Sequence, residues 1–326
     1  MTNPERDPSE TTLAPGDTSC GVEVLAPREV PLGGPRAMTV RRTLPSRQRS
    51  LIGAWCFVDH YGPDRVADTG GMSVAPHPHT GLQTVSWLFT GEVEHRDSAG
   101  HHAMVRPGEV NLMTAGRGIS HSEVSPASTT ELHGAQLWVA LPEEARDGAP
   151  GFEHHAPDPV AGEGYLARVF LGSLLGVTSP VATFTPLLGA ELLLDAGARV
   201  EIEVDRSFEH GVLVDTGSAT VEGQEVEPAE LVYAAPGRAT LTVEGHDVVR
   251  LLLLGGPPFE ESIVMWWNFV GRTHEEIVAF RAQWQAQIDG VSDSRRVAPG
   301  RFGVVEDHLP PIPAPELPNA RLKHRR

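Results

Sequence analysis

The chain of 326 residues contains a single lysine, Lys323, and two cysteines, Cys20 and Cys56. A P-loop requires a lysine on the nucleotide phosphates, so a lone lysine near the C-terminal end excludes this type of site. It also argues against Schiff-base catalysis. Two cysteines cannot form a disulfide framework or a thiolate zinc site. Any chemistry of this chain must therefore come from other side chains.

Long apolar runs and an excess of positive charge are also missing. No segment approaches the ~18 apolar residues of a membrane span, and the polar, acidic start of the chain has no signal-peptide core. Asp and Glu number 43 against 26 Lys and Arg, which gives a formal net charge of −17. This charge disfavours binding to phosphates or to an anionic membrane. We expect a cytoplasmic protein without a membrane partner or direct nucleic-acid contacts.

Short alternating segments separated by Gly and Pro indicate an all-β fold. Residues 83–89 place Val85, Trp87 and Phe89 on one face, and in residues 135–141 every second side chain is apolar. A segment from Pro107 to Gly116 also resembles a later segment from Pro228 to Gly237, with the same spacing between the two end residues. We interpret this as two similar β domains in tandem, the alternative being chance similarity between β turns.

One segment has the periodicity of a helix. Apolar residues recur with helical spacing between Thr273 and Ile288, at Ile277, Phe280, Ala282, Trp284 and Ile288. Thr273 and Glu276 form the pattern of a capping box. We therefore predict an amphipathic helix packed on the β core. The domain boundaries that follow are a disordered tail over 1–20, a first β domain over 21–145, a second β domain with the helix over 146–290, and a disordered tail over 291–326.

Histidines gather in the first β domain, where eight of the 15 lie between His60 and His133. His77 and His79 form an i, i+2 pair, and His121 and Glu123 form another. Residues at i and i+2 of a strand point to the same face, so two neighbouring strands would direct three imidazoles and a carboxylate at one point. Such a set suits Fe(II) and tolerates Mn, Co, Ni, Cu or Zn, whereas Mg and Ca prefer oxygen ligands.

Each pair taken alone is typical of a polar strand end or a loop, and the combination is what indicates a metal site. We expect Gly116 and Gly118, just before His121, to let the backbone pass close to the ion. Among the other polar residues, we interpret His95 as a surface strand residue and His101 and His102 as a turn. His60 is a candidate for lining the pocket, and Asp97 is a candidate partner behind the ligands.

Three longer motifs resemble the pirin family of the cupin superfamily. They are Pro76–Gly81, Gly91–Ser98 and Met113–Glu123, and the resemblance continues through Gly172–Pro180 and Trp267–Glu276. It spans roughly residues 20–290. The resemblance implies a bicupin, which consists of two tandem cupin-type β-barrels, here with a C-terminal amphipathic helix.

The resemblance also implies a metal centre in the N-terminal cupin. Its ligands would be His77, His79, His121 and Glu123, and its metal is usually iron, here Fe(II), with another divalent transition metal as the alternative. The C-terminal cupin of pirins generally lacks a metal. The repeat places the corresponding positions near four residues that include no histidine: Glu203, Asp205, Thr242 and Glu244.

One position departs from the cupin pattern. A glutamate usually follows the second histidine by four residues, whereas this chain has Gln83. That glutamate is not a metal ligand in pirins, so we expect metal binding to survive. The role of this position behind the ligands is open.

Two functions follow from the resemblance. The first is an oxidoreductase of the quercetin 2,3-dioxygenase type, which takes O2 and a small flavonol-like aromatic enol. In it the metal would act as a Lewis acid on the enol, and Glu123 would be the catalytic general base. The alternative is a non-enzymatic, metal-dependent regulator, such as a transcriptional or metabolic cofactor, that binds protein partners. A different cupin chemistry and a purely structural metal are further alternatives.

Overall fold

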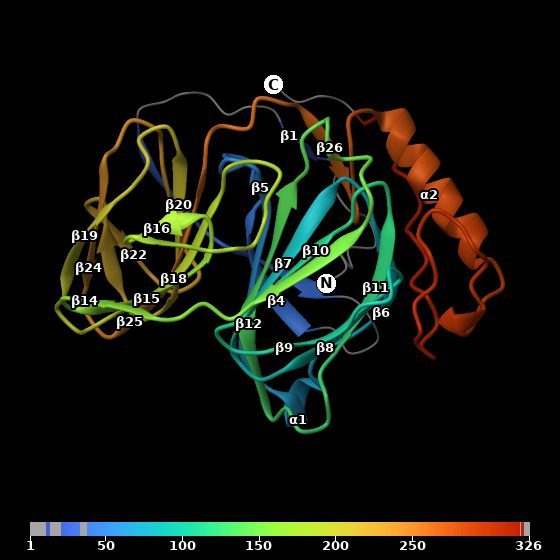
Figure 1. The fold of residues 1–326 in the computed structure, drawn as a ribbon, viewed down its shortest axis with the longest axis horizontal. Helices are drawn as coiled ribbons and strands as arrows, with labels where there is room; N and C mark the ends of the chain where they lie inside the picture. The colour runs from blue at the N-terminus through green and yellow to red at the C-terminus, as the bar shows by residue number, and fades with distance from the viewer. Residues whose placement is uncertain (1–10, 14–20, 33–37, 320, 323–326) are drawn as a thin grey trace.

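Two β-barrels lie side by side in the chain (Figure 1). The structure is a computed structural model that describes residues 11–13, 21–32, 38–319 and 321–322. Each barrel combines a seven-stranded sheet with a four-stranded sheet, and neighbouring strands in the described sheets pair antiparallel. The predicted all-β bicupin is therefore confirmed. Most of the predicted N-terminal tail lies outside the described residues, but Thr11–Leu13 form β1, which pairs with β26 (Ile263–Trp266).

The N-terminal barrel has the sheet orders β13-β10-β7-β12-β5-β4-β3 and β6-β11-β8-β9. A short helix, α1 (Val66–Thr69), follows β5. The strands are β3 (Arg28–Leu32), β4 (Met38–Leu44), β5 (Trp55–Arg65), β6 (Ser73–His79), β7 (Leu82–Thr90), β8 (Val93–Asp97), β9 (His102–Val105), β10 (Val110–Thr114), β11 (Ile119–Val124), β12 (Glu131–Ala140) and β13 (Gly151–His155).

The C-terminal barrel has the sheet orders β14-β15-β18-β25-β20-β23-β2 and β19-β24-β21-β22. A small hairpin, β16 (Ser173–Leu174) and β17 (Val177–Thr178), lies beside them. The strands are β2 (Val22–Leu25), β14 (Val160–Gly162), β15 (Tyr165–Leu171), β18 (Leu188–Leu194), β19 (Arg199–Glu203), β20 (Glu209–Thr216), β21 (Ala219–Val221), β22 (Gln224–Val226), β23 (Leu231–Ala234), β24 (Thr240–Gly245) and β25 (Val249–Gly256).

The two barrels repeat one topology, as the internal similarity predicted. The turn before β10 contains Gly108 and the equivalent turn before β23 contains Ala229. Both residues have a left-handed backbone, with φ of 74° and 70°. An alanine rarely adopts this conformation, which glycine adopts without steric cost. The turn geometry is thus retained in the second barrel even though its glycine is not.

The barrels also exchange edge strands. β2 pairs with β23 and completes the large sheet of the C-terminal barrel. β13 pairs with β10 and completes the large sheet of the N-terminal barrel. The boundaries expected at 21–145 and 146–290 place each of these strands in the opposite domain, because turns and composition do not reveal which sheet an edge strand joins.

The interior of the C-terminal barrel is largely apolar. Side chains from its smaller sheet fill it, among them Val200, Ile202, Leu241 and Val243. Glu203 and Asp205, the positions that the repeat aligns with ligands, are exposed. Because side chains alternate along a strand, the acidic residues of β19 lie on the face opposite to the core.

The predicted helix is α2 (His274–Ile288), and the side chain of Thr273 accepts a hydrogen bond from the Glu276 backbone N–H at its start. Its buried face contains Ile277, Phe280 and Trp284, whereas Ala282 is exposed, contrary to our expectation. The helix packs beside β27 (Phe269–Gly271), at the end of the N-terminal barrel far from the C-terminal one (Figure 1). It therefore covers the first domain, although we grouped it with the second.

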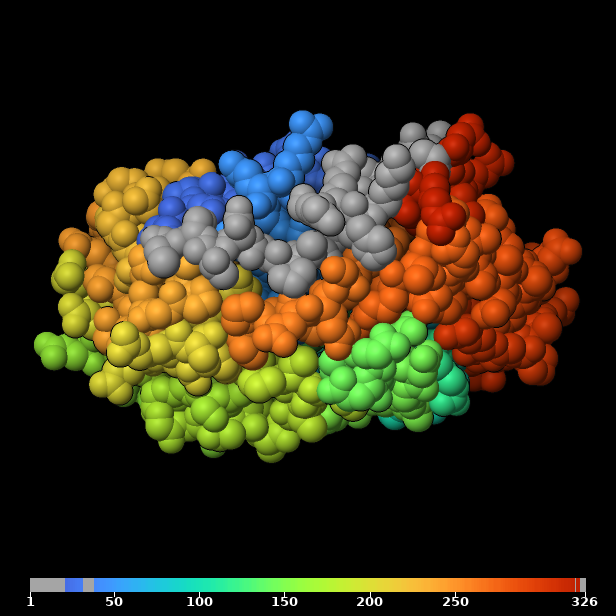
Figure 2. Space-filling view, turned by 90° about the horizontal axis from the view of Figure 1, so that it is seen from above, coloured from blue at the N-terminus to red at the C-terminus, as the bar shows by residue number. Residues whose placement is uncertain are grey.

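The segment from 291 to 319 packs against the same end of the molecule, where we expected disorder (Figure 2). Phe302 is fully buried, and its carbonyl accepts a hydrogen bond from the Ser120 hydroxyl at 2.8 Å. The hydroxyl of Ser122 donates to Asp307 at 2.7 Å. A proline-rich composition suggested disorder, but apolar residues dispersed in this segment anchor it to the barrel. Within the described ranges, no helix is long and apolar enough to cross a membrane.

Candidate metal centre

The candidate ligands lie on two neighbouring strands, β6 and β11. These strands are antiparallel, and His121 is the register partner of His77. His79 lies two residues further along β6, and Ile119 is its partner. The i, i+2 spacing therefore places His77, His79 and His121 together, as predicted, and all three are completely buried.

The three imidazoles form one cluster of nitrogen atoms. One ring nitrogen from each residue lies within 4.8 Å of the other two, and Nε2 of His79 is 3.1 Å from Nε2 of His121. With metal–nitrogen bonds of about 2.1 Å, this separation corresponds to an angle of about 95° at an ion. The spacing thus fits two neighbouring ligands of one ion. A hydrogen bond between two neutral imidazoles fits the same distance.

Protonation states favour the ligand interpretation. The ring nitrogen Nδ1 of His77 lies 2.9 Å from the Ala75 carbonyl oxygen, to which it can only donate. Nε2 of a neutral His77 is then unprotonated, and it is buried without a hydrogen-bond partner among the described residues. Burial lowers the pKa values of His77, His79 and His121 well below the usual range. All three are therefore neutral nitrogen donors near pH 7, which is the form that binds a metal.

Glu123 belongs to a second cluster that shares only His121 with the first. Its carboxylate lies within 4.8 Å of ring nitrogens of His95 and His121. The register of β6 and β11 shifts between His121 and Glu123, which changes the direction of the glutamate relative to the three imidazoles. Glu123 is buried, and its charge together with burial raises the pKa of Tyr61 well above the usual range.

His95 is the residue of this region that sequence reasoning missed. We interpreted it as a surface residue, but it is buried, with 4% of its surface exposed. Its Nδ1 lies 3.3 Å from Nδ1 of His121, and its Nε2 lies 3.3 Å from Asp97. Asp97 also contacts the ring of His101 at 3.0 Å. The i, i+2 spacing of His95 and Asp97 on β8 was the available signal, and it matches that of the other pairs.

The glycines before His121 have a role different from the one expected. A Cβ on Gly116 would lie 2.3 Å from the Gly148 carbonyl oxygen. A Cβ on Gly118 would lie 2.9 Å from the Arg301 side chain. The absence of a side chain at these glycines therefore leaves space for the loop that contains Gly148 and for the C-terminal segment, rather than for an ion. Gln83, the departure from the cupin pattern, is buried and donates a hydrogen bond to Thr114 at 3.0 Å.

An aromatic wall borders the cluster on the side of β12. Trp138 meets the His79 ring edge-on, with ring centroids 5.2 Å apart, and stacks on Phe57 at 4.0 Å. Cys56 lies behind this wall, where burial raises the pKa of its thiol to about 12. A thiol in that state is not a metal ligand near neutral pH.

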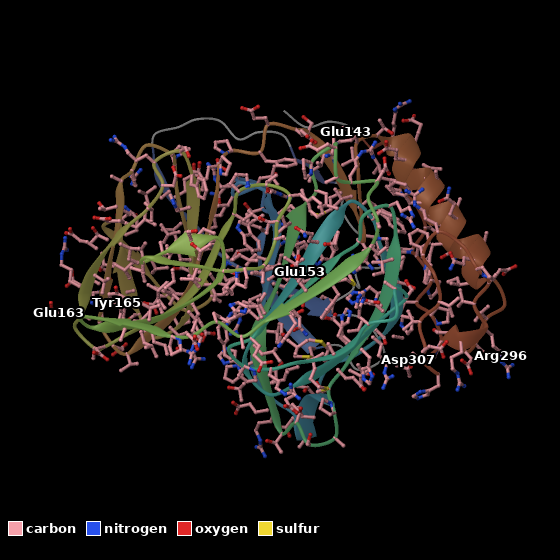
Figure 3. The ribbon with its side chains drawn as sticks, viewed as in Figure 1. Glu143, Glu153, Glu163, Tyr165, Arg296 and Asp307 are labelled. Atoms are coloured by element: carbon pink, nitrogen blue, oxygen red, sulfur yellow. The ribbon has the colours of Figure 1, made fainter. Side chains whose placement is uncertain are left out.

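The outer face of the ligand strands is supported by the C-terminal segment. Figure 3 shows Asp307 beside β11, where it accepts the hydrogen bond from Ser122. Ser120 and Ser122 flank His121 in sequence and so point away from the cluster. His60, which we expected to line the pocket, contacts Asp215 of the C-terminal barrel at 2.6 Å instead.

Comparison with known proteins agrees with this architecture. The family model for pirin matches residues 37–139, and the model for the pirin C-terminal cupin domain matches residues 189–288. A Pseudomonas aeruginosa protein, provisionally named a quercetin 2,3-dioxygenase, is 43% identical over 292 residues, which is 89% of each chain. The chain belongs to the pirin family. Rat pirin is 31% identical over 73% of this pirin-family chain and 83% of its own.

Solved structures show the same two-barrel fold. A crystal structure of quercetin 2,3-dioxygenase from Acinetobacter baumannii superposes on this pirin-family chain with a TM-score of 0.84 and 39% identity, covering 93% of this chain and 98% of its own. The Escherichia coli pirin YhhW, solved in complex with nickel(II), has a TM-score of 0.58 and 18% identity, covering 73% of this chain and all of its own. This second likeness shows the fold alone.

Proposed function

We propose that this chain is a mononuclear metal-dependent dioxygenase of the quercetin 2,3-dioxygenase type. Its substrates would be O2 and a flavonol-like aromatic enol. The observation that supports this function is the buried cluster of three neutral imidazoles, in which Nε2 of His77 has no partner among the described residues. The names of the Pseudomonas and Acinetobacter relatives supply the reaction class.

The proposed ligands are His77, His79, His121 and Glu123. Three imidazoles and a carboxylate suit Fe(II), which is our proposal for the metal, and the same set accommodates Ni(II) or another divalent transition ion. The bound ion would supply Lewis-acid chemistry toward an enol oxygen and O2. A distant pirin of this fold was solved with nickel(II), which makes Ni(II) the first alternative to test.

The chain's own residues have two further roles in this proposal. Glu123 takes the proton of the substrate hydroxyl at a carboxylate oxygen, as a general base. Its carboxylate lies within 4.8 Å of ring nitrogens of His95 and His121, which are its neighbours in this role. Trp138, which stacks on Phe57 and meets His79 edge-on, gives the cluster an apolar aromatic neighbour of the kind that suits an aromatic substrate.

Oxygen consumption by anaerobically purified, Fe(II)-loaded protein tests the proposal, with quercetin as the first substrate. We expect uptake that depends on iron and is lost in His121→Ala, together with the metal. The matched control is His102→Ala, which removes an exposed imidazole of the same barrel and should keep both metal and uptake. Iron-replete protein that consumes no oxygen with quercetin or related enols would overturn the dioxygenase function.

A regulator that binds a protein partner is the second candidate. Support comes from the connection between β11 and the C-terminal segment, because Ser120 and Ser122 join the ligand strand to Phe302 and Asp307. The net charge of −17 favours a basic partner. Pull-downs with wild type and His121→Ala test this role. Identical partners in both would exclude metal control of binding.

A further inference from the structure

A second cluster of buried histidines lies where the two barrels meet. His60 on β5 and His133 on β12 belong to the N-terminal barrel, and Asp215 on β20 belongs to the C-terminal barrel. No more than 4% of any of the three is exposed. One potential ligand atom from each lies within 4.8 Å of the other two. The cluster shares no residue with the candidate metal centre.

A β-bulge helps to form this cluster. β12 pairs with β5 and β7, and both registers shift next to His133. A bulge changes the direction of the side chain at that point of a strand. It brings the His133 ring to within 5.5 Å of the His60 ring, measured between centroids.

The two imidazoles approach the same oxygen atom. Nε2 of His60 and Nε2 of His133 are each 2.6 Å from Oδ1 of Asp215. Nε2 of His133 has no hydrogen bond of regular geometry among the described residues, although its closeness helps to lower the pKa of Asp215. Nδ1 of His60 also has no partner there. One carboxylate oxygen thus faces two imidazole nitrogens, an arrangement that an ion shared by all three side chains would also satisfy.

The charges around the cluster leave one carboxylate oxygen available. Arg250 contacts the other oxygen of Asp215 at 3.3 Å, and Glu191 in turn lies 3.4 Å from Arg250. Burial raises the pKa of Asp215, but the two imidazoles outweigh it and lower that pKa to about 2. Burial also lowers the pKa of His60, with Arg41 adding to this effect. A carboxylate and a neutral imidazole therefore face each other near pH 7.

We propose that His60, His133 and Asp215 bind a second transition-metal ion at the junction of the barrels. Two imidazoles and one carboxylate form a three-ligand set that suits Zn2+, Ni2+ or Fe2+ and leaves a position for water. Asp215 would bind through Oδ1 alone, because Arg250 holds Oδ2. With bonds of about 2.1 Å and angles of about 90–110° at the ion, the 2.6 Å contacts would widen to about 3.0–3.4 Å.

Because positive charges lie near the cluster, we expect it to bind an ion less tightly than a site surrounded only by carboxylates. Arg41 and Arg250 oppose a cation, and Asp215 and Glu191 offset them. Because the ligands come from both barrels, the bound ion would connect them directly. The proposal stands apart from the dioxygenase function, since the ion and its ligands are separate from the first centre.

The proposal is tested by measuring the number of bound metal ions per chain in a variant whose first metal centre has been removed. The parent is the double variant His77→Ala/His121→Ala, stripped with a chelator, loaded with Zn2+ and analysed by inductively coupled plasma mass spectrometry. We expect one ion per chain in the parent and a loss of at least tenfold in Zn2+ affinity when Asp215→Asn or His133→Gln is added. The matched control is Glu209→Gln, which replaces a different buried carboxylate of β20 and should retain the ion.

A titration of the wild-type protein removes any dependence on the folding of variants. Co2+ added to metal-free wild type, followed by its visible absorption, should saturate at two equivalents per chain. Circular dichroism and size-exclusion chromatography verify that each variant is folded. Saturation at one equivalent in wild type together with no bound ion in the folded parent, or a folded Asp215→Asn variant that retains the parent's ion, would overturn the second site.

Discussion

His210 provides a test of how burial controls stability in the C-terminal barrel. It lies on β20 and is buried, and neither ring nitrogen has a hydrogen-bond partner among the described residues. Burial, with a smaller contribution from Arg238, lowers its pKa from 6.5 to about 4, although Asp205 acts in the opposite direction. The folded protein therefore holds this imidazole in the neutral form throughout the physiological pH range.

The pH dependence follows from the difference between the folded and unfolded states. The unfolded chain binds a proton at His210 near pH 6.5, whereas the folded chain does so only near pH 4. Acid therefore favours unfolding. The contribution to stability is fully present above about pH 6.5 and is lost as the pH falls toward 4. By proton linkage, His210 alone should lower the free energy of unfolding by about 2 kcal/mol between pH 7 and pH 5.

Urea unfolding of chelator-treated wild type and His210→Leu at both pH values measures this contribution. Leucine has a similar volume, and its introduction breaks no hydrogen bond. We expect the wild type to lose about 2 kcal/mol more than the variant between pH 7 and pH 5. His246→Leu, which removes an exposed imidazole of the same barrel, shows whether loss of any histidine has this effect. Equal losses in wild type and His210→Leu would refute the reasoning.

Three further predictions concern the N-terminal barrel. Arg42 and Asp59 form a buried ion pair with contacts of 2.6 and 2.9 Å. Arg42→Met leaves Asp59 buried without this partner and should lower the free energy of unfolding, measured in urea, by about 3 kcal/mol. The double variant Arg42→Met/Asp59→Leu should recover most of this loss. Ser122→Ala removes a donor from buried Asp307 and should cost about 1–3 kcal/mol in the same assay. A chain that ends at Gly290 lacks the segment that covers the outer face of β6 and β11. It should melt at a lower temperature and retain less metal in dialysis. An unchanged melting temperature and metal content would show that the C-terminal segment does not support the ligand strands.

The sequence predicted features that depend on neighbouring residues along one strand. Alternation of apolar side chains and regular turns indicated two β domains, and i, i+2 spacing brought His77, His79 and His121 together on one face. The assignment of these residues and Glu123 as metal ligands remains a prediction that metal analysis must test.

Features that depend on contacts between distant segments were not accessible in this way. His60 and Asp215 are 155 residues apart and meet only because β5 and β20 face each other across the two barrels. His95 is buried because β8 lies beside β11, a pairing that spacing alone does not reveal. The C-terminal segment is rich in proline, which favoured disorder, yet Phe302 anchors it in the core beside α2.

The exchange of β2 has a consequence for how the chain folds during synthesis. Val22 leaves the ribosome early, but its partner Ala234 follows 212 residues later (234 − 22). At translation rates of about 5–20 residues per second, the N-terminal strand waits roughly 10–40 s for its sheet. The C-terminal barrel thus includes a strand that is synthesised before the N-terminal barrel. It can be completed only after both halves of the chain have been synthesised.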